Sequence, residues 1–430
     1  MNPRLLAHDL LQKAEKTEQF SNIALDKALL DAKMSDIDSA LASALFYGVT
    51  EKKITLDYRL AALSSRPLDT LDKSVLCALR MGLYQLEFMD RIPAHAAINE
   101  TVSLCSRKSA GFVNAILRSH TRTAATPLPS KEDDTISYLS VKYSIIPALC
   151  EKFLSVYGLE KCESIFTALD KTPPTTLRVN TLRISREALA EKIPSAELTE
   201  LSAHGLKIKA SVRSAYGFDD GLFFVQDEAS QLCVEALEAN AGETIMDICA
   251  CPGSKSFGSA IRMNNQGKIL SYDLHEKKLS LITSGAKRLG IDIITTAQRD
   301  GRDFLPEMEE SADKVLCDVP CSGFGVLAKK PELRYKDPSV SATLPDIQLA
   351  ILENACRYVK RGGRLVYSTC TVFPEENEEN VHRFLDRHNN FSLTPFCAGA
   401  LTVDSGMITL LPDEHGTDGF FITVMTKKGE

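Results

Sequence analysis

The chain has 430 residues and a mass of 47.2 kDa, with 44% hydrophobic and 25% charged residues. This composition is typical of globular proteins and excludes a mostly disordered or fibrous chain, and the length predicts about two to four domains. The formal net charge of −7 argues against a protein that binds nucleic acid over its whole surface. The sequence has no long apolar run, and its first residues form a charged amphipathic pattern, so we expect a cytoplasmic protein without a membrane span.

The first part of the chain is predicted to be an all-helical domain over residues 1–125. Its net charge is +2, whereas the remainder carries −9. Apolar residues recur there at three- and four-residue spacing, which is typical of helices. We expect Gly111 to separate the last two helices. The predicted helices cover residues 3–16, 22–33, 37–49, 71–90, 93–107 and 111–122. The stretch 123–134 contains two prolines and an acidic run, and we interpret it as a linker.

Basic residues without acids occupy residues 101–131. On charge alone, this stretch is either a solvated basic face or a patch for phosphate groups. Its basic residues are Arg107, Lys108, Arg118, Arg122 and Lys131.

Residues 135–235 are predicted to form a small α/β module. The pattern predicts helices over 137–158, 161–170 and 186–193, and strands within 173–185, 206–212 and 221–226. From residue 236 to 430, short apolar strands alternate with helices, which indicates a mainly parallel sheet covered on both faces. The predicted strands are 243–249, 268–273, 292–297, 313–318 and 363–369, and the predicted helices are 277–290 and 344–361.

Ligands bind such sheets at the carboxyl ends of the strands, so the residues that follow each strand are candidates for chemistry. A glycine-bearing turn, CACPGSKS, follows the first strand, although it is not a dinucleotide fingerprint. Asp273, Asp300 and Asp318 end or follow the next three strands, and Cys370 follows the fifth. An acid in the position of Asp273 can accept hydrogen bonds from ribose hydroxyls. Each acid alone is more often a helix cap, but together they indicate a site at one edge.

The 12 cysteines include no Cys-x-x-Cys pair, so we predict no structural zinc site and no other metal. Most of them are expected to be reduced and buried in the core, as we expect for Cys249, Cys251 and Cys317. Cys321 and Cys370 differ because both lie just beyond apolar strands at the predicted edge.

Several motifs resemble those of the RNA 5-methylcytosine methyltransferase family, the Nol1/Nop2/Sun group. They are FFVQDEASQL, DICACPGSK, SYD, DGRDF, DVPCSGFGVLAKKPELRYK and VYSTCTVFPEENEENV. The segment RMGLYQLEFMDRIPAHAAINETVSLCSRKSAGFVNAILR is similar to NusB-type RNA-binding helical domains. Together they resemble the RsmB (Sun) family of bacterial 16S rRNA cytosine-C5 methyltransferases over nearly the whole chain. The resemblance implies a NusB-like domain, the small α/β module, and a Rossmann-like methyltransferase domain with a mainly parallel seven-stranded sheet.

The resemblance also implies roles for the residues at the sheet edge. Cys370 would add to carbon 6 of cytosine, Cys321 would assist product release, and Asp318 would contact the cytosine edge beside the cofactor. The cofactor would be S-adenosyl-L-methionine, with its methionine part on the turn, its ribose on Asp273 and its adenine near Asp300. The cofactor-binding residues would be Cys249, Ala250, Cys251, Pro252, Gly253, Ser254, Lys255, Asp273, Asp300 and Asp318.

Lys255 has two open readings, since it either reaches the active site or lies on the surface at a helix start. The turn also departs from the usual CAAPGGK pattern at Cys251 and Ser254, which puts cofactor affinity in question because serine lacks the backbone freedom of glycine. The resemblance favours RNA binding by the basic stretch, and further charges either meet RNA or are simply solvated. The RNA-binding candidates are Arg107, Lys108, Arg118, Arg122, Arg178, Lys329, Lys330 and Arg334.

The expected partner is 16S rRNA, naked or in a partly assembled small subunit, and the target base must be unpaired or flipped out. We expect a monomer that does not bind membranes. Three alternatives remain open: the same reaction on tRNA, a non-catalytic RNA-binding or ribosome assembly factor, and a NusB-like antitermination protein. The last explains only the first 125 residues, and a binding factor has no chemical need for two thiols at adjacent strand ends.

Overall fold

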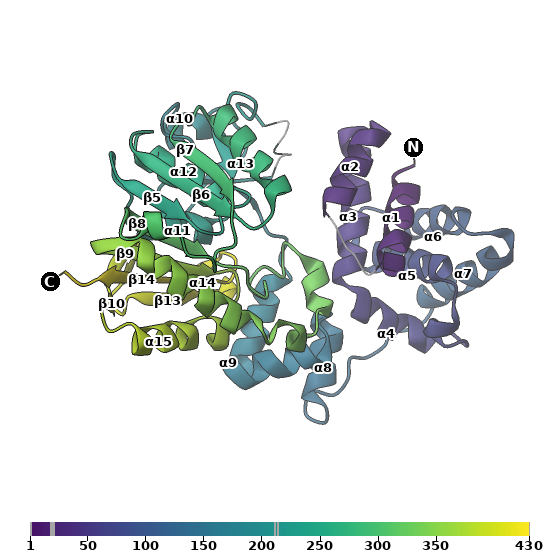
Figure 1. Cartoon of the computed structure of the whole chain (residues 1–430). Coiled ribbons are helices and arrows are strands. Elements are labelled where there is room, and N and C mark those ends of the chain that lie inside the picture. Colours follow the sequence, from purple (N-terminus) through teal and green to yellow (C-terminus); the bar gives the residue numbers. More distant parts are fainter. Residues whose placement is uncertain (1, 18–21, 210–211, 213–214, 430) are drawn as a thin grey trace. The chain divides into compact units, whose positions relative to one another are not determined.

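The computed structural model describes the whole chain except residues 1, 18–21, 210–211, 213–214 and 430 (Figure 1). The chain divides into two compact units. Unit 1 comprises Met1–Phe166 together with Lys330–Pro338, and unit 2 comprises Thr167–Lys329 and Ser339–Glu430. The second piece of unit 1 is therefore separated from the first by more than half of the other unit in sequence. Among the described residues, no helix is both long enough and apolar enough to cross a bilayer.

Unit 1 is helical in its described part. A buried core forms around α5, where Leu79, Met81 and Leu83 are fully covered by neighbouring helices. The Asp72 side chain begins α5 by accepting a hydrogen bond from the Ser74 amide at 2.8 Å. The helices are α1 (Pro3–Thr17), α2 (Asn22–Ala32), α3 (Asp36–Glu51), α4 (Lys53–Leu63), α5 (Lys73–Phe88), α6 (Ala94–Ser103), α7 (Arg107–His120), α8 (Thr135–Tyr143) and the kinked α9 (Pro147–Leu169), which runs on into unit 2.

Two features of unit 1 differ from the sequence prediction. Helix α4 was not among the predicted helices. Gly111 lies inside α7 rather than between two helices, and a side chain at its position would meet open space. The break falls instead at residues 104–106, where Ser106 takes an extended backbone conformation at the N-cap of α7.

The second piece of unit 1 contains a short 3-10 helix, η3 (Pro331–Tyr335), whose side chains join the helices of this unit. Arg334 is completely buried and donates to the Tyr143 carbonyl at 2.7 Å, while its own carbonyl accepts from the Ile146 amide at 3.0 Å. The Tyr335 hydroxyl lies at the junction of α3 and α4. The segment is therefore an integral part of the helical unit.

Unit 2 begins with the strands of the predicted small module, whereas α8 and most of α9, which were predicted to belong to the same module, lie in unit 1. An antiparallel sheet has the order β2-β3-β1-β4, with β1 (Thr175–Val179), β2 (Glu197–Leu198), β3 (Gly205–Ile208), β4 (Phe223–Val225) and the short helix α10 (Arg186–Ala190). The strand predicted over 206–212 corresponds to β3 in its first part, and residues 210 and 211 lie outside the described residues.

The rest of unit 2 is built on a second sheet with the order β10-β14-β9-β8-β5-β6-β7. The five strands from β9 to the edge strand β7 run parallel, and β14 pairs antiparallel with β9 and β10. An eighth strand, β13, pairs with β14 beside the predicted seven-strand path. The strands are β5 (Thr244–Asp247), β6 (Lys268–Asp273), β7 (Ile294–Gln298), β8 (Ala312–Asp318), β9 (Val359–Thr369), β10 (Phe391–Leu393), β13 (Met407–Leu410) and β14 (Phe420–Lys427), and a separate hairpin pairs β11 (Phe396–Ala398) with β12 (Leu401–Val403).

Alternate residues of the strands pack against different helices, as the period of two requires. Ile245 of β5 lies in the core beneath α11, α12 and α13, whereas the next residue, Met246, lies in the core beneath α14 and α15 (Figure 1). The covering helices are α11 (Glu228–Leu237), α12 (Ser254–Arg262), α13 (Glu276–Leu289), α14 (Leu344–Tyr358) and α15 (Glu378–Arg387). With both faces covered, the exposed edge at the strand ends is left for ligands.

Candidate active site

The parallel strands bring the predicted residues to one edge of the sheet. Asp273 and Asp318 are the last residues of β6 and β8, and Cys370 directly follows β9. Asp247, which was not predicted as a site residue, ends β5 at the same edge. Asp300 lies two residues beyond β7, where its carboxylate pairs with Arg302 at 2.5 Å. That ion pair lowers the pKa of Asp300 to about 2.

The two predicted catalytic thiols meet at this edge. The sulfur atoms of Cys321 and Cys370 are 2.9 Å apart, and the Cys370 amide donates to the Cys321 sulfur at 3.2 Å. The hydrogen bond to Cys370 and burial raise the pKa of Cys321 well above its ordinary value, so Cys321 keeps its proton. Backbone hydrogen bonds of two glycines hold the loop that follows Cys321. The Gly325 amide donates to the Cys370 carbonyl at 3.0 Å, and the Gly419 amide donates to the Gly325 carbonyl at 2.8 Å.

Lys255 is buried and bonded to Asp318, so it is not a surface lysine at a helix start. Its ammonium lies 2.6 Å from one Asp318 oxygen and 3.3 Å from the Ser230 hydroxyl, and Ser368 donates to the other Asp318 oxygen at 2.8 Å. Burial alone would lower the pKa of Lys255, but the Asp318 carboxylate outweighs it and raises the pKa. Ser230 and Ser368 were not predicted, since lone serines carry no distinguishing sequence signal.

The glycine turn after β5 has the geometry of a ligand cradle. Gly253 has a φ of +108°, and a side chain there would lie 2.6 Å from the Phe257 ring, so only glycine fits. Ser254 is the first residue of α12, and the structure does not give it a positive φ. The departure from the usual pattern at this position therefore causes no backbone strain. The peptide bond between Cys251 and Pro252 is cis.

Two acids border this turn. The Asp273 oxygens each accept one backbone amide, from Cys251 at 3.2 Å and from His275 at 2.9 Å. A carboxylate has about four acceptor positions, so this one keeps capacity for ribose hydroxyls. Asp247 is buried and accepts from Ser256 at 2.6 Å, while its second oxygen has no hydrogen-bond partner in the described structure. Burial raises the pKa of Asp247 to about 7. The turn and these acids fit the predicted cofactor.

The predicted RNA-binding residues divide into two groups. Lys330 is exposed, and so are the four basic residues on α7 and just beyond it, which we call the α7 basic cluster. Its members are Arg107, Lys108, Arg118 and Arg122.

The structure contradicts the expectation of RNA contact for Arg178 and Arg334, which are both buried. The Arg178 side chain is 2% exposed and donates to the Gln231 carbonyl, and the Arg334 side chain is fully buried in unit 1. Lys329 is bonded to Asp227 and to Asp418, the latter at 2.8 Å. The charges of Arg178 and Arg334 thus serve the interior of the protein, whereas the Lys329 side chain is 31% exposed and its contact with RNA stays a prediction.

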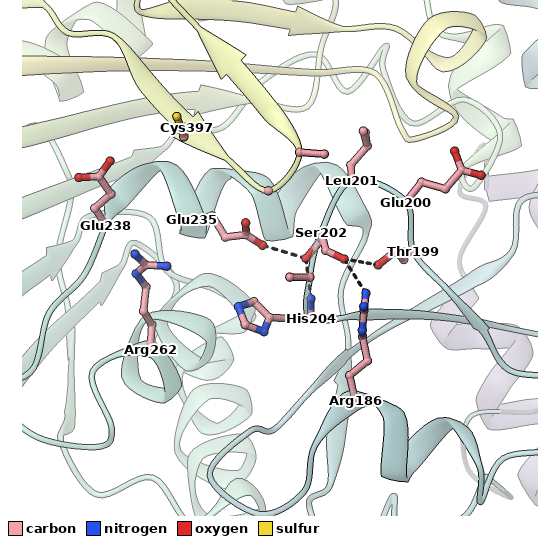
Figure 2. A pocket seen from close by; sticks show the side chains of 13 residues that line it. Arg186, Thr199, Glu200, Leu201, Ser202, His204, Glu235, Glu238, Arg262 and Cys397 are labelled. Atoms are coloured by element: carbon pink, nitrogen blue, oxygen red, sulfur yellow. Dashed lines mark hydrogen bonds between the residues drawn. The ribbon is translucent and has the colours of Figure 1, made fainter.

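A separate pocket of about 590 Å³ lies elsewhere in unit 2 (Figure 2). Its lining includes Glu235 near the end of α11 and Arg262 at the end of α12, where these helices lead into β5 and β6. The pocket therefore lies toward the beginnings of the parallel strands, whereas the cysteines follow the strand ends. Figure 2 shows its polar groups bonded to one another: Ser202 donates to Glu235 at 2.8 Å and accepts from Arg186 at 3.2 Å. None of the predicted site residues lines it. In the described part of the chain, no group of three or more His, Cys, Asp or Glu side chains is arranged to hold a metal ion.

The strand order, the glycine turn and the acids at successive strand ends define a Rossmann-like methyltransferase. Three family models match the chain: the NusB family over residues 1–122, the RsmF/B-like ferredoxin-like domain over 148–214, and the 16S rRNA methyltransferase RsmB/F model over 234–426. The chain is 36% identical to the probable ribosomal RNA small subunit methyltransferase B of Bacillus subtilis, with 99% of each chain covered. It is 33% identical to the corresponding probable enzyme of Synechocystis, covering 99% of this chain and 100% of that one.

A solved structure of the protein PH0851 is similar over 99% of both chains, with 27% identity and a TM-score of 0.81. The chain therefore belongs to the RsmB/F family of 16S rRNA methyltransferases. It is a methyltransferase that uses S-adenosylmethionine as its methyl donor.

Proposed function

We propose that this protein methylates carbon 5 of a cytosine in 16S rRNA through a covalent bond between the Cys370 sulfur and carbon 6 of the base. The observation that carries the proposal is the pair of thiols, Cys321 and Cys370, whose sulfur atoms lie 2.9 Å apart beside Asp318. Relatives named ribosomal RNA small subunit methyltransferase B support rRNA as the substrate. The resemblance of the motifs points to cytosine 967 as the target.

The residues of this site can perform each step of that reaction. The Cys370 thiolate adds to carbon 6, and the electron pair of the carbon 5–carbon 6 double bond becomes available at carbon 5 as nitrogen 3 takes a proton. Asp318 accepts hydrogen bonds from the protonated nitrogen 3 and the amino group. S-adenosylmethionine supplies the methyl group that carbon 5 attacks. Loss of the carbon 5 proton to water then restores the double bond and expels the Cys370 thiolate, and nitrogen 3 gives up the proton that it had taken.

Cys321 assists the last step because of its position. Its protonated thiol lies within hydrogen-bond reach of the Cys370 sulfur, so it stabilises negative charge on that sulfur as the covalent bond breaks. Without this donor the thiolate is a poorer leaving group, and the RNA stays attached. The two cysteines therefore have different expected phenotypes although they are neighbours.

The cofactor residues and the RNA-binding residues belong to the same proposal. The turn over Cys249–Lys255 holds the methionine part, Asp273 holds the ribose, and Asp300 lies on the adenine side. The α7 basic cluster and Lys330 hold the RNA backbone and set its register. We also keep the division into domains at 1–125, 135–235 and 236–430 as part of the proposal.

The decisive experiment is bisulfite sequencing of an unmodified 16S rRNA transcript after incubation with the enzyme and S-adenosylmethionine. One newly protected cytosine is expected. If none appears, a tRNA transcript is tested in the same way. Protection of tRNA alone would replace the rRNA substrate, and protection of neither RNA would contradict the methylation itself.

The covalent step is tested by substituting each cysteine. Cys370→Ala should abolish methylation and form no RNA adduct, because the attacking sulfur is gone. Cys321→Ala should accumulate protein bound to RNA that survives denaturing electrophoresis. An adduct in Cys370→Ala and none in Cys321→Ala would mean that the two roles are exchanged.

A further inference from the structure

Glu376 and Asn377 are consecutive buried residues between Cys370 and α15. Their side chains are 1% and 0% exposed. They belong to the motif VYSTCTVFPEENEENV, in which only the cysteine has a role in the chemistry above. A buried carboxylate beside a buried amide is costly unless both are hydrogen-bonded, so their partners show what they do.

Asn377 is hydrogen-bonded to both chain neighbours of Cys370, to a side chain on one side and to the backbone on the other. Its amide oxygen accepts from the Thr369 hydroxyl at 2.6 Å, and its amide nitrogen donates to the Thr371 carbonyl at 3.2 Å. Thr369 and Thr371 are the direct neighbours of Cys370 and are fully buried. A single side chain therefore limits the movement of Cys370 from both directions.

Glu376 and Gln348 of α14 together bind the backbone of the two chain neighbours of Cys321. One Glu376 oxygen accepts from the Ser322 amide at 2.9 Å and from the Gln348 side-chain amide at 2.8 Å. The same Gln348 nitrogen donates to the Pro320 carbonyl at 3.0 Å. Pro320 and Ser322 are the direct neighbours of Cys321, so its backbone is held on both sides.

The two halves are joined to each other and to the sheet. The Ser322 hydroxyl donates to the Thr371 hydroxyl at 2.8 Å, which links the residue after one cysteine to the residue after the other. The hydroxyl of Tyr367, in β9, donates to the Glu376 carbonyl at 2.6 Å. This hydrogen-bond network is thereby attached to β9, a strand inside the sheet, rather than to a surface loop.

We propose that Glu376 and Asn377 are positioning residues that together set the separation of the Cys321 and Cys370 sulfur atoms. Each residue acts through the neighbours of one cysteine, and their adjacency in the chain couples the two. This role rests on the proposed function because it takes Cys321 and Cys370 as the reacting thiols. Its test measures the thiol geometry itself, so it does not depend on methylation.

The test is the rate at which full-length protein forms a disulfide between Cys321 and Cys370 when treated with diamide. Diamide takes up the two electrons and two protons that the thiols lose, and the product is counted by peptide mass spectrometry. A disulfide needs a narrow range of Cβ separations, so Asn377→Ala should slow the reaction by about tenfold or more. Glu376→Gln should slow it less, because its amide oxygen can still accept from the Ser322 amide.

A matched control separates positioning from general stability. Asn180 is also fully buried, and its amide nitrogen donates to the Gly221 and Leu289 carbonyls, both at 2.9 Å. Asn180→Ala should lower the melting temperature as Asn377→Ala does and leave the disulfide rate unchanged. If Asn377→Ala does not fold, Asn377→Asp serves the same test, since it keeps the acceptor for Thr369 and loses the donor to Thr371.

Disulfide rates within twofold of wild type in the Asn377 and Glu376 variants would overturn the proposal, whatever their stability. A slow rate in Asn180→Ala equal to that of Asn377→Ala would overturn it too. In a protein that methylates RNA, Asn377→Ala should also lower kcat by about 100-fold, the cost of misplacing a reacting group by about 1 Å, and leave KM for RNA unchanged. A wild-type protein that methylates neither RNA would contradict the proposed function and still leave the disulfide measurement to decide the positioning.

Discussion

Tyr335→Phe removes one hydroxyl that completes the junction of two helices in unit 1. The carbonyls of Thr50 and Glu51 end α3 and lie 2.7 and 2.8 Å from this hydroxyl, and the Lys53 amide that begins α4 donates to it at 3.1 Å. Because a hydroxyl has one proton, it satisfies one carbonyl at a time and accepts from one amide. Ser144 also lies 3.0 Å away, but its hydroxyl accepts from the Ile54 amide and keeps that partner.

The expected magnitude follows from the groups that lose their partner. One carbonyl and the Lys53 amide are left without it, at about 1–1.5 kcal/mol each, which makes a local loss of about 2.5 kcal/mol. Since about 1.4 kcal/mol corresponds to a factor of ten, amide protection around the start of α4 should fall roughly 50-fold. Hydrogen exchange read by NMR or mass spectrometry measures this directly, without assuming that the whole chain unfolds in one step.

The matched control is Tyr138→Phe in α8 of the same unit. Its hydroxyl contacts only the Lys142 ammonium among the described hydrogen bonds, at 2.9 Å, and both residues are partly exposed. No change in exchange at the start of α4 is expected there. If Tyr335→Phe also left the protection of Lys53 and its neighbours within about twofold of wild type, the assignment of this hydroxyl as the helix-junction partner would be refuted.

Three further outcomes are expected. Asp273→Ala should raise the Kd for S-adenosylmethionine by about 10- to 100-fold in calorimetry, because two hydroxyl partners are lost; an unchanged Kd would remove Asp273 from the cofactor site. The pKa of Asp247, raised by burial to about 7, means that ionisation destabilises the folded state, so the wild type loses stability as the pH rises toward 7. Asp247→Asn has no carboxyl to ionise, so its unfolding free energy relative to the wild type should rise by up to about 1.4 kcal/mol per pH unit between pH 5 and 7 and level off above pH 7. A difference in unfolding free energy that does not change with pH would contradict this. Replacing the α7 basic cluster with alanine should weaken RNA binding and reduce the salt slope by about 3, whereas an unchanged slope would return the cluster to solvent.

The sequence predicts the fold well where a repeated pattern specifies it. The strand over Lys268–Asp273 has the predicted bounds, and the acids that follow the parallel strands meet at one edge because parallel strands end on the same side. The pairing of Cys321 and Cys370 follows from the same rule, since β8 and β9 are neighbours. Helix α4 escaped prediction because its apolar pattern is weaker than that of the other α-helices within residues 1–125.

Side-chain partners are what the sequence could not supply. Arg178 and Arg334 carry the charge expected of RNA contacts, yet both are buried and bonded to backbone carbonyls. Lys329 follows Cys321 in a basic run but is neutralised by two aspartates that are distant in sequence. Asn377 lies in a quoted motif, but its role depends on which backbone groups it reaches, and that is decided only by packing.

The return of Lys330–Pro338 to the helical unit has a consequence for synthesis on the ribosome. The first 166 residues emerge with the Ile146 amide and the junction of α3 and α4 still lacking the partners that Arg334 and Tyr335 provide. The N-terminal unit therefore becomes complete only after β5 to β8, half of the eight strands of the methyltransferase sheet, have been translated. The predicted linker at 123–134 lies within unit 1, and a chain cut there would also separate Lys330–Pro338 from α3 and α4. Unit 1 therefore cannot be obtained intact as one continuous N-terminal fragment.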